Sequence, residues 1–501
     1  MLGATAGIAL ALAACAVGPD YRPPETPMPA HFDAAKTAAS SRDSRVIDSA
    51  QWWRALRDRE LNSLIQRAIA ASPTLEAALN RVQQARAQEA FIVGTALPLA
   101  EGSGGGALGT GSDLPRARAS PALVSGENAL GVSQVNGMGG FDAVWELDLW
   151  GKYRRAIESA QYDVDAAVAA RNGVVISLIA DVTRAYLDMR ALQMQLEVLR
   201  KNIEVANKYV DFVQERFNRG ITNELDVTLA QRESAQLASQ VAPLIGQIKV
   251  MQYVIAALVG EYPASLVKEL AKPGKLPALP ARIRPGLPIE LLRRRPDIQE
   301  AERQVASATA LIGVATGDLF PQVVLVGSYG WQTWRGLGPA INPIWSLGPG
   351  VAAPLLDFGR LDAVVEKADY RARELFDNYK QAVLNAVRDV DAAVEGYAAQ
   401  QQRLRNLDNA VTAAMRAVSL AEQRFDRGLI DSLNVIDAQR QLYNLQEEYV
   451  LAQQSEAEQF VLLYKSLGGG WEQYQAIPLI PPPLPAAAAA VKHLVAPDAA
   501  P

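Results

Sequence analysis

Histidine and cysteine are nearly absent from this 501-residue chain, which contains two histidines and one cysteine. The histidines, His31 and His493, lie in terminal segments rich in proline and alanine, which argues against a histidine metal site or a histidine-based catalytic triad. A single cysteine excludes an internal disulfide. The net charge of -5 gives no basic bias toward nucleic acid. Because the sequence shows no phosphate loop, metal cluster or activated nucleophile, we expect neither an enzyme nor a bound cofactor.

The one cysteine, Cys15, ends an apolar stretch of about fourteen residues, which is too short for a transmembrane helix and suits a signal peptide. "LAAC" matches the bacterial lipoprotein processing box, in which the cysteine becomes the lipidated first residue. Ala16, rather than aspartate, follows it, which resembles lipoproteins sorted to the outer membrane. The usual basic segment is missing, which leaves open a start upstream of Met1. We expect a covalent lipid on Cys15; the alternative is an ordinary signal peptide with an incidental cysteine.

The chain repeats itself at long range. "RFNRGITNELDVTLAQR" begins at Arg216, and "RFDRGLIDSLNVIDAQR" begins about 208 residues later at Arg424. The match extends without insertion across Gly151–Gly260, and the first copy carries roughly fifteen extra residues after Pro98. A period this long is typical of a duplicated domain and not of a solenoid. The predicted segments are a signal peptide (1–14), a lipid-anchored N-terminal segment (15–57), a first repeat (58–260), an inter-repeat linker (261–290), a second repeat (291–470) and a low-complexity tail (471–501).

Aromatic residues are scarce at 7%, whereas alanine is abundant, which favours long and closely packed helices. Apolar residues recur at intervals of three and four residues over 58–93 and again in "PDIQEAERQVASATALIGVAT", which predicts amphipathic helices. The same period persists over 153–218, a helix of roughly 100 Å. A shorter helix is predicted over 223–259 after the "RFNRG" turn. The outgoing and returning helices together are little longer than the long one, so we expect them to lie end to end along it.

Two segments alternate apolar and polar residues, "GGFDAVWELDLWG" and "PQVVLVGSYGWQTW", and the alternation predicts strands with one apolar face. The glycine-rich stretch from Glu101 and "GLGPAINP" are interpreted as hairpin connections. We therefore predict two strands per repeat and four per chain. Four strands cannot close into a membrane barrel, so the chain must share a barrel with other copies, and three copies supply twelve strands.

These features together resemble TolC-like outer-membrane efflux proteins, particularly the NodT-type lipoprotein branch that serves RND drug pumps. The resemblance covers residues 15–470 and rests on the tandem repeats, "LAAC", "GPDYRPP", "LLRRRPDI", "PLLDFGR" and the paired "RF-x-RG" turns. It implies an α+β membrane protein that forms a homotrimer. By the same resemblance, we expect a 12-stranded β-barrel in the outer membrane, a long α-helical barrel across the periplasm, and an equatorial belt formed by the linker and terminal segments. The basic residues Arg293–Arg295 are expected to have a structural role in that belt.

The resemblance also implies a periplasmic gate at the helical tips, where acidic side chains face inward. Counting from the tip glycines, the two acidic positions fall on Asn434 and Asp437 in the second repeat and on Asp226 and Leu229 in the first. One acid of the pair is therefore missing. Asp431 is expected to take part in contacts between the tips. The alternative is that Asp226 and Asp437 lie in first helical turns, where the helix dipole favours acids.

By the same resemblance, Arg219, Gly220, Arg427 and Gly428 contact the helical hairpin of a periplasmic adaptor protein, which links the channel to an inner-membrane RND transporter. The alternative is simple capping of the helix ends, and both roles are compatible. The expected function is a passive trimeric duct that exports drugs or other small toxic compounds. The alternative function is a structural envelope lipoprotein without a pore. Strands with one polar and one apolar face beside glycine-rich loops favour the duct, since a purely structural lipoprotein needs no membrane barrel.

Overall fold

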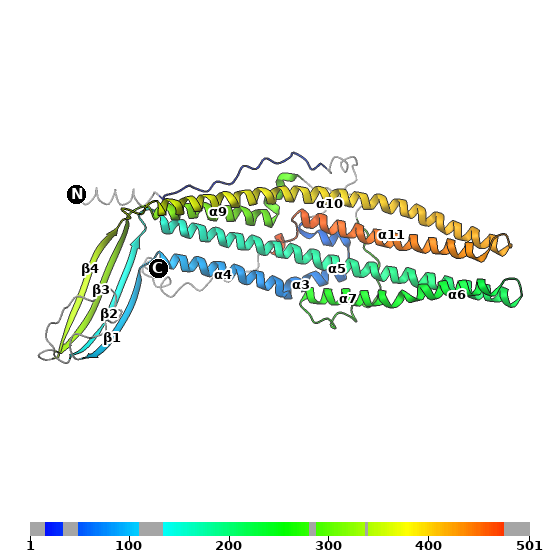
Figure 1. Ribbon diagram of the computed structural model, residues 1–501, viewed down its shortest axis with the longest axis horizontal. Coiled ribbons are helices and arrows are strands. Elements are labelled where there is room, and N and C mark those ends of the chain that lie inside the picture. Colours follow the sequence, from blue (N-terminus) through cyan, green and yellow to red (C-terminus); the bar gives the residue numbers. More distant parts are fainter. Residues whose placement is uncertain (1–15, 34–48, 110–133, 280–286, 336–338, 475–501) are drawn as a thin grey trace, which may run out of the picture.

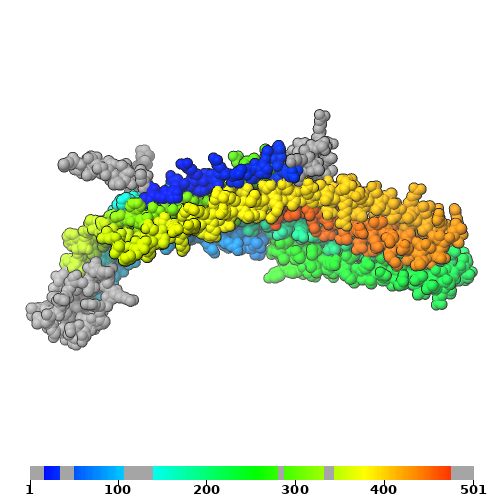
Figure 2. Space-filling view, turned by 45° about the horizontal axis from the view of Figure 1, so that its top comes forward, coloured from blue at the N-terminus to red at the C-terminus, as the bar shows by residue number. Residues whose placement is uncertain are grey.

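The computed structural model describes residues 16–33, 49–109, 134–279, 287–335 and 339–474, which form a long bent rod (Figure 1, Figure 2). A β-sheet forms one end of the rod, and two helical hairpins reach the other end. Three parts of the chain lie outside the described residues: the predicted signal peptide with Cys15, residues 110–133 in the part of the first repeat that carries the extra residues, and the tail from residue 475.

A four-stranded antiparallel sheet confirms the predicted two strands per repeat. Its strands are β1 (Leu99–Gly109), β2 (Gln134–Leu147), β3 (Gln322–Arg335) and β4 (Pro339–Ala352), in the order β1-β2-β3-β4. The central pair β2–β3 joins the two repeats, with Gly140 opposite Gly330. Among the described residues, β1 and β4 each pair on one side only, so both are edge strands.

The prediction that the glycine-rich stretches only connect strands is wrong. β1 runs through Gly102–Gly109, and β4 begins at Pro339 within "GLGPAINP". Glycine disfavours strands when it is judged alone, but β1 pairs with β2 along its whole length, and at Gly139 of β2 close approach requires glycine. A Cβ added to Gly139 would lie 2.9 Å from Cζ2 of Trp331 on the next strand. Packing across the sheet therefore overrides local propensity.

Long helices make up the rest of the rod. The first repeat contains α3 (Arg59–Ala71), α4 (Pro73–Thr95), α5 (Lys152–Asn218), α6 (Glu224–Ser239) and α7 (Val241–Val259). The second contains α8 (Leu291–Arg294), α9 (Pro296–Gly317), α10 (Arg360–Asp426) and α11 (Ser432–Ser466). Short 3-10 turns are η1 (Ser49–Leu56), η3 (Pro288–Glu290) and η4 (Glu472–Tyr474). Helices α5 and α10 have 67 residues each, as the repeat predicted.

Two helices that were predicted to be continuous are divided beside prolines. The helix expected over 58–93 breaks at Ser72, which is extended (φ −68°, ψ 121°) because a residue before proline avoids the helical region. The helix expected over 223–259 breaks at Gln240, and Pro243 follows in the first turn of α7, where its missing N–H is tolerated. Apolar periodicity continues through both breaks and so did not reveal them.

The shorter helices lie along the two long ones, as predicted. α4, α7 and α6 follow one another along α5, whereas α9 and α11 follow one another along α10 (Figure 1). α9 and α11 also pack against α5, so contacts between the repeats unite them in one body. This arrangement carries the two "RG" turns, side by side, to the end of the rod opposite the sheet.

A buried aromatic core lies where the N-terminal segment and the end of the second repeat meet the helices. Trp52, 1% exposed, stacks on Tyr464 with ring centroids 5.4 Å apart, and Phe460 packs against both rings. Trp471 is also buried, so the core continues past residue 470.

Arg295 has structural contacts, in line with the role expected of it. Its guanidinium donates to the carbonyl of Ser466 at 2.9 Å and pairs with Asp297 at 2.6 Å. It therefore joins the start of α9 to the end of α11.

Candidate functional site

Both hairpins end in the same turn. Gly220 (φ 72°) and Gly428 (φ 68°) adopt the left-handed conformation that glycine tolerates without strain. The amides of Gly220 and Ile221 donate to the carbonyls of Phe217 and Arg216, and the second tip repeats this pattern of bonds. The pattern is the Schellman motif, in which a left-handed residue caps a helix end. The capping interpretation thus describes the two glycines, and it leaves the side chains of the turns available for contacts.

Four large apolar side chains at the tips are exposed to solvent. The exposed fraction is 58% for Ile221, 63% for Leu225, 67% for Leu429 and 56% for Leu433. Ile221 and Leu429 occupy equivalent positions in the repeats, as do Leu225 and Leu433. We call these four residues the tip apolar surface; exposed apolar clusters of this kind mark interaction surfaces. Sequence reasoning missed them, although their recurrence at the repeat spacing was a usable signal.

Just behind the turns, the two hairpins contact each other through a small apolar cluster, where the green and orange ends adjoin in Figure 2. Its buried members are Tyr209, Val213, Val227, Ala230, Phe425, Val435 and Ile436. The guanidinium of Arg216 lies over the ring of Phe425, 4.8 Å from its centroid. This cluster holds the two tips of one chain side by side.

Asp226 links the two hairpins. Its carboxylate accepts hydrogen bonds from the hydroxyl of Ser432, at the start of α11, and from Thr222 in its own turn. Burial alone would raise the pKa of Asp226, but these bonds, a backbone hydrogen bond from Asn223 and the charge of Arg216 hold the pKa below its ordinary value. A lowered pKa means that the contact is fully present above the ordinary aspartate pKa and is lost only on stronger acidification. The carboxylate is therefore ionised at neutral pH.

A second polar link lies farther from the tips, between α6 and α11. Nη2 of Arg440 lies 2.6 Å from Oε2 of Glu233, which is only 8% exposed, and Tyr443 donates to Gln240 at 2.6 Å. Because a buried carboxylate is costly unless it is paired, the Arg440–Glu233 pair is expected to resist separation of the hairpins. The two residues are 207 positions apart, and sequence reasoning did not identify either of them.

The predicted gate residues of the second hairpin are all exposed. Asp431 occupies the N-cap position of α11 without a side-chain cap hydrogen bond, and Asn434 lies in the first turn. Asp437 lies in the second turn, because α11 begins at Ser432, so the alternative that placed it in a first helical turn is wrong. Asp226 does lie in the first turn of α6, where the helix dipole adds to its hydrogen bonds.

The two tip arginines are exposed as well. Arg219 forms an ion pair with Glu215, one turn earlier in α5, and does not reach across to the second hairpin. Arg427 occupies the equivalent cap position after α10. Of these two residues, Asp226 reaches the other hairpin, whereas Arg219 pairs within its own.

The segment that follows Cys15 is fixed where the sheet meets the helices. The amide of Val17 donates to the carbonyl of Trp150 at 2.9 Å. Arg155 donates to the carbonyl of Val17 at 3.2 Å and pairs with Asp20 at 2.6 Å. Cys15 itself lies outside the described residues, but the chain that continues from it is held beside the end of the helices that joins the sheet.

Known proteins resemble this chain in sequence and in fold. The family described as outer membrane efflux protein matches residues 113–261 and 287–469, one match per repeat. Nodulation protein T of Rhizobium leguminosarum bv. viciae is 31% identical over 471 residues, which are 93% of each chain. The pyoverdine export outer membrane protein OpmQ of Pseudomonas aeruginosa is 31% identical over 86% of this chain and 89% of its own. The solved structure of the outer-membrane channel OprN has a TM-score of 0.81 at 32% identity, over 91% of this chain and 100% of that one. The chain therefore belongs to the outer membrane efflux protein family, as its motifs predicted, and acts as an outer-membrane channel for efflux and not as an enzyme.

Proposed function

We propose that three copies of the chain form one continuous duct through the outer membrane and periplasm, through which drugs or other small toxic compounds leave the cell. The sheet with two edge strands, β1 and β4, carries this proposal. Inside a membrane every backbone N–H and C=O must be paired, so β1 of one copy pairs with β4 of the next. Twelve strands leave room for an open lumen, whereas four cannot close into a barrel.

The helical part supports the same assembly. The most apolar window of Glu224–Val259 has a mean hydropathy of 1.5, yet only 22% of it is buried within one chain. On α7, Val250, Tyr253 and Val254 are 52%, 41% and 40% exposed. An exposed apolar face of this kind marks an interaction surface, and the helices of a neighbouring copy have the length to bury it.

Recordings in planar lipid bilayers, together with native mass spectrometry, test the duct. We expect discrete conductance steps from a species with the mass of a trimer. A stable monomer, or a trimer that never conducts even when its tips are opened by mutation, would instead favour a structural lipoprotein that braces the envelope.

The partners we propose are a periplasmic adaptor protein and an inner-membrane transporter of the RND type. The tip apolar surface supports an adaptor, because apolar side chains at the end of a long rod have no function in a free channel. Relatives of this chain are named for pyoverdine export, solvent efflux and cation efflux. Since these names cover unlike cargo, the choice of compound is expected to lie with the transporter.

Replacing Asp437 with alanine is expected to lower the cation preference of the open duct severalfold. Asp437 is exposed near the tips, and three copies around a threefold axis would form a ring of carboxylates, which is a recurrent cation filter. Reversal potentials across a salt gradient measure the effect. The matched Asn434→Ala variant removes no charge and should keep the preference. If Asp437→Ala also keeps it, the carboxylate does not face the lumen.

Cys15 is expected to be acylated, and Cys15→Ser is expected to weaken membrane anchoring without preventing assembly, because the barrel itself spans the membrane. Mass spectrometry of the mature N-terminus measures the acylation. The fraction of the Cys15→Ser variant that mild washes extract from the membrane measures the anchoring. An unmodified cysteine, or cleavage at another position, contradicts this prediction.

A further inference from the structure

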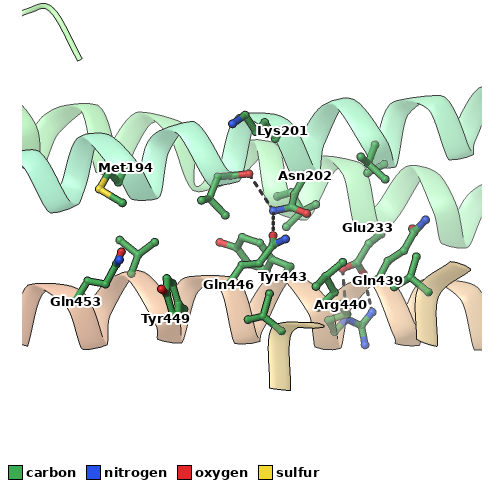
Figure 3. A pocket seen from close by; sticks show the side chains of 18 residues that line it. Met194, Lys201, Asn202, Glu233, Gln439, Arg440, Tyr443, Gln446, Tyr449 and Gln453 are labelled. Carbon is green, nitrogen blue, oxygen red and sulfur yellow. Dashed lines mark hydrogen bonds and ion pairs between the residues drawn. The ribbon is translucent and has the colours of Figure 1, made fainter. Parts of the chain in front are cut away.

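The two repeats of one chain contact each other toward the tips, through Glu233 and Arg440 (Figure 3), and again where the sheet joins the helices. At the second place, Trp150, between β2 and α5, stacks on Phe320, between α9 and β3, with ring centroids 4.8 Å apart. The indole N–H of Trp150 donates to the carbonyl of Pro321 at 2.8 Å. We call this contact, in which the start of α5 packs against the end of α9, the joint between the repeats.

The helices approach each other closely at the joint. Nζ of Lys152 lies 2.6 Å from Oδ1 of Asp318, and a Cβ added to Gly317 of α9 would lie 2.9 Å from Cβ of Lys152. The equivalent of Gly317 in the first repeat is Gly94 on α4, since α4 and α9 begin at equivalent prolines. Within the described part of one chain, a Cβ added to Gly94 would meet open space. Because glycine weakens a helix, glycine at this open position points to a close contact that a single chain does not supply.

The two stacked rings of the joint also have equivalents, and these are exposed in one chain. Trp150 corresponds to Phe358, which is 90% exposed, and Phe320 corresponds to Leu97, which is 37% exposed. Leu97 lies just before the edge strand β1, whereas Phe358 follows the edge strand β4 at the opposite side of the sheet. The chain therefore presents the two halves of a second joint on opposite sides, where they cannot meet within one copy but can meet between copies.

We propose that neighbouring copies bind each other through a second joint of the same kind, in which Phe358 of one copy packs on Leu97 of the next. Arg360, the equivalent of Lys152, lies against Gly94 of the same neighbour. The ion pair of the first joint is not repeated, because a threonine stands at the acidic position of the first repeat, so packing holds the second joint together. The inference rests on the proposed trimer, in which the second joint forms three times, and names the surface that unites its copies.

Cross-linking of paired cysteines in the full-length protein tests the contact. Leu97→Cys and Phe358→Cys are combined with Cys15→Ser, which removes the one native cysteine, and the protein is treated with a short bismaleimide. We expect covalent trimers on a denaturing gel from the pair and monomers from each single variant. The matched control pairs Phe358→Cys with Tyr262→Cys and should stay monomeric, because Tyr262 is 87% exposed but follows α7, which lies far from the sheet (Figure 1). If native mass spectrometry finds a trimer that does not cross-link, this inference alone is overturned; if it finds no trimer, the proposed duct fails as well.

Gly94→Leu tests the close approach and is expected to weaken association of the copies by at least about tenfold, because the new side chain must collide with the neighbouring copy. Within one chain the same side chain meets open space and favours the helix, so helical content should not fall. The matched control is Gln88→Leu on the same helix, whose equivalent, Leu311 of α9, stays 45% exposed beside the first joint. It should associate as the parent does. Dissociation of the trimer on dilution, followed by native mass spectrometry, measures both variants, and a Gly94→Leu trimer as persistent as the parent overturns the proposal.

Discussion

A chain that carries both Ile221→Asp and Leu429→Asp is expected to lose efflux activity completely, so that cells become as sensitive to toxic compounds as cells without the channel. The two side chains are 58% and 67% exposed at equivalent positions of the two tips. If an adaptor covers them, each new carboxylate must be buried against apolar atoms, which costs at least about 2 kcal/mol. Two such sites per chain are expected to weaken adaptor binding by at least about a hundredfold. Growth inhibition and adaptor pull-down measure the two effects.

The matched control exchanges the apolar residues, Ile221→Leu with Leu429→Ile, and should retain full activity. Both positions lie in turns outside the helices, so helical content, trimer mass and single-channel conductance of the aspartate variant should match the parent protein. Normal growth of cells that express the aspartate variant would show that the tip apolar surface is not the docking site.

The double variant Asp226→Ala with Arg440→Met is expected to convert the closed duct into a leaky one. Arg440→Met leaves the buried carboxylate of Glu233 without its partner, which costs about 1 to 3 kcal/mol. Asp226→Ala removes the link to Ser432 between the turns. Three chains each lose both links, so the closed-state conductance in planar bilayers is expected to rise at least severalfold. Each single substitution should open the duct only in part, because the other polar link remains.

Lys208→Met is the matched control for loss of charge. Lys208 pairs with Glu204 at 2.7 Å within α5, and both side chains are exposed. Exposed pairs of this kind contribute little to stability, so the conductance should not change. Closed-state conductance that stays low in the double variant would mean that contacts between chains, and not those within one chain, keep the duct shut.

Much of the architecture was predictable because the chain contains it twice. The turns at Gly220 and Gly428 follow helices of the same length, and a helix end that needs a left-handed residue is recognisable from glycine alone. Apolar residues that keep the helical period over 67 residues also predict a helix. At Ser72 and Gln240 the apolar periodicity predicted a continuous helix, but the helix breaks there. The spacing of apolar residues does not reveal a break beside a proline.

By itself, the sequence determined the repeat, the number of strands, the two long helices and the family, because each depends on local pattern or on motifs. Tertiary structure alone decided which side chains meet. The spacing from the tip glycine singled out Asp226, but nothing in the sequence identifies Ser432, 206 positions away, as its partner. They meet because α6 and α11 pack side by side behind the turns, around an apolar cluster drawn from both repeats. The glycine-rich strand β1 has the same explanation, since only its pairing with β2 overcomes the poor strand propensity of glycine.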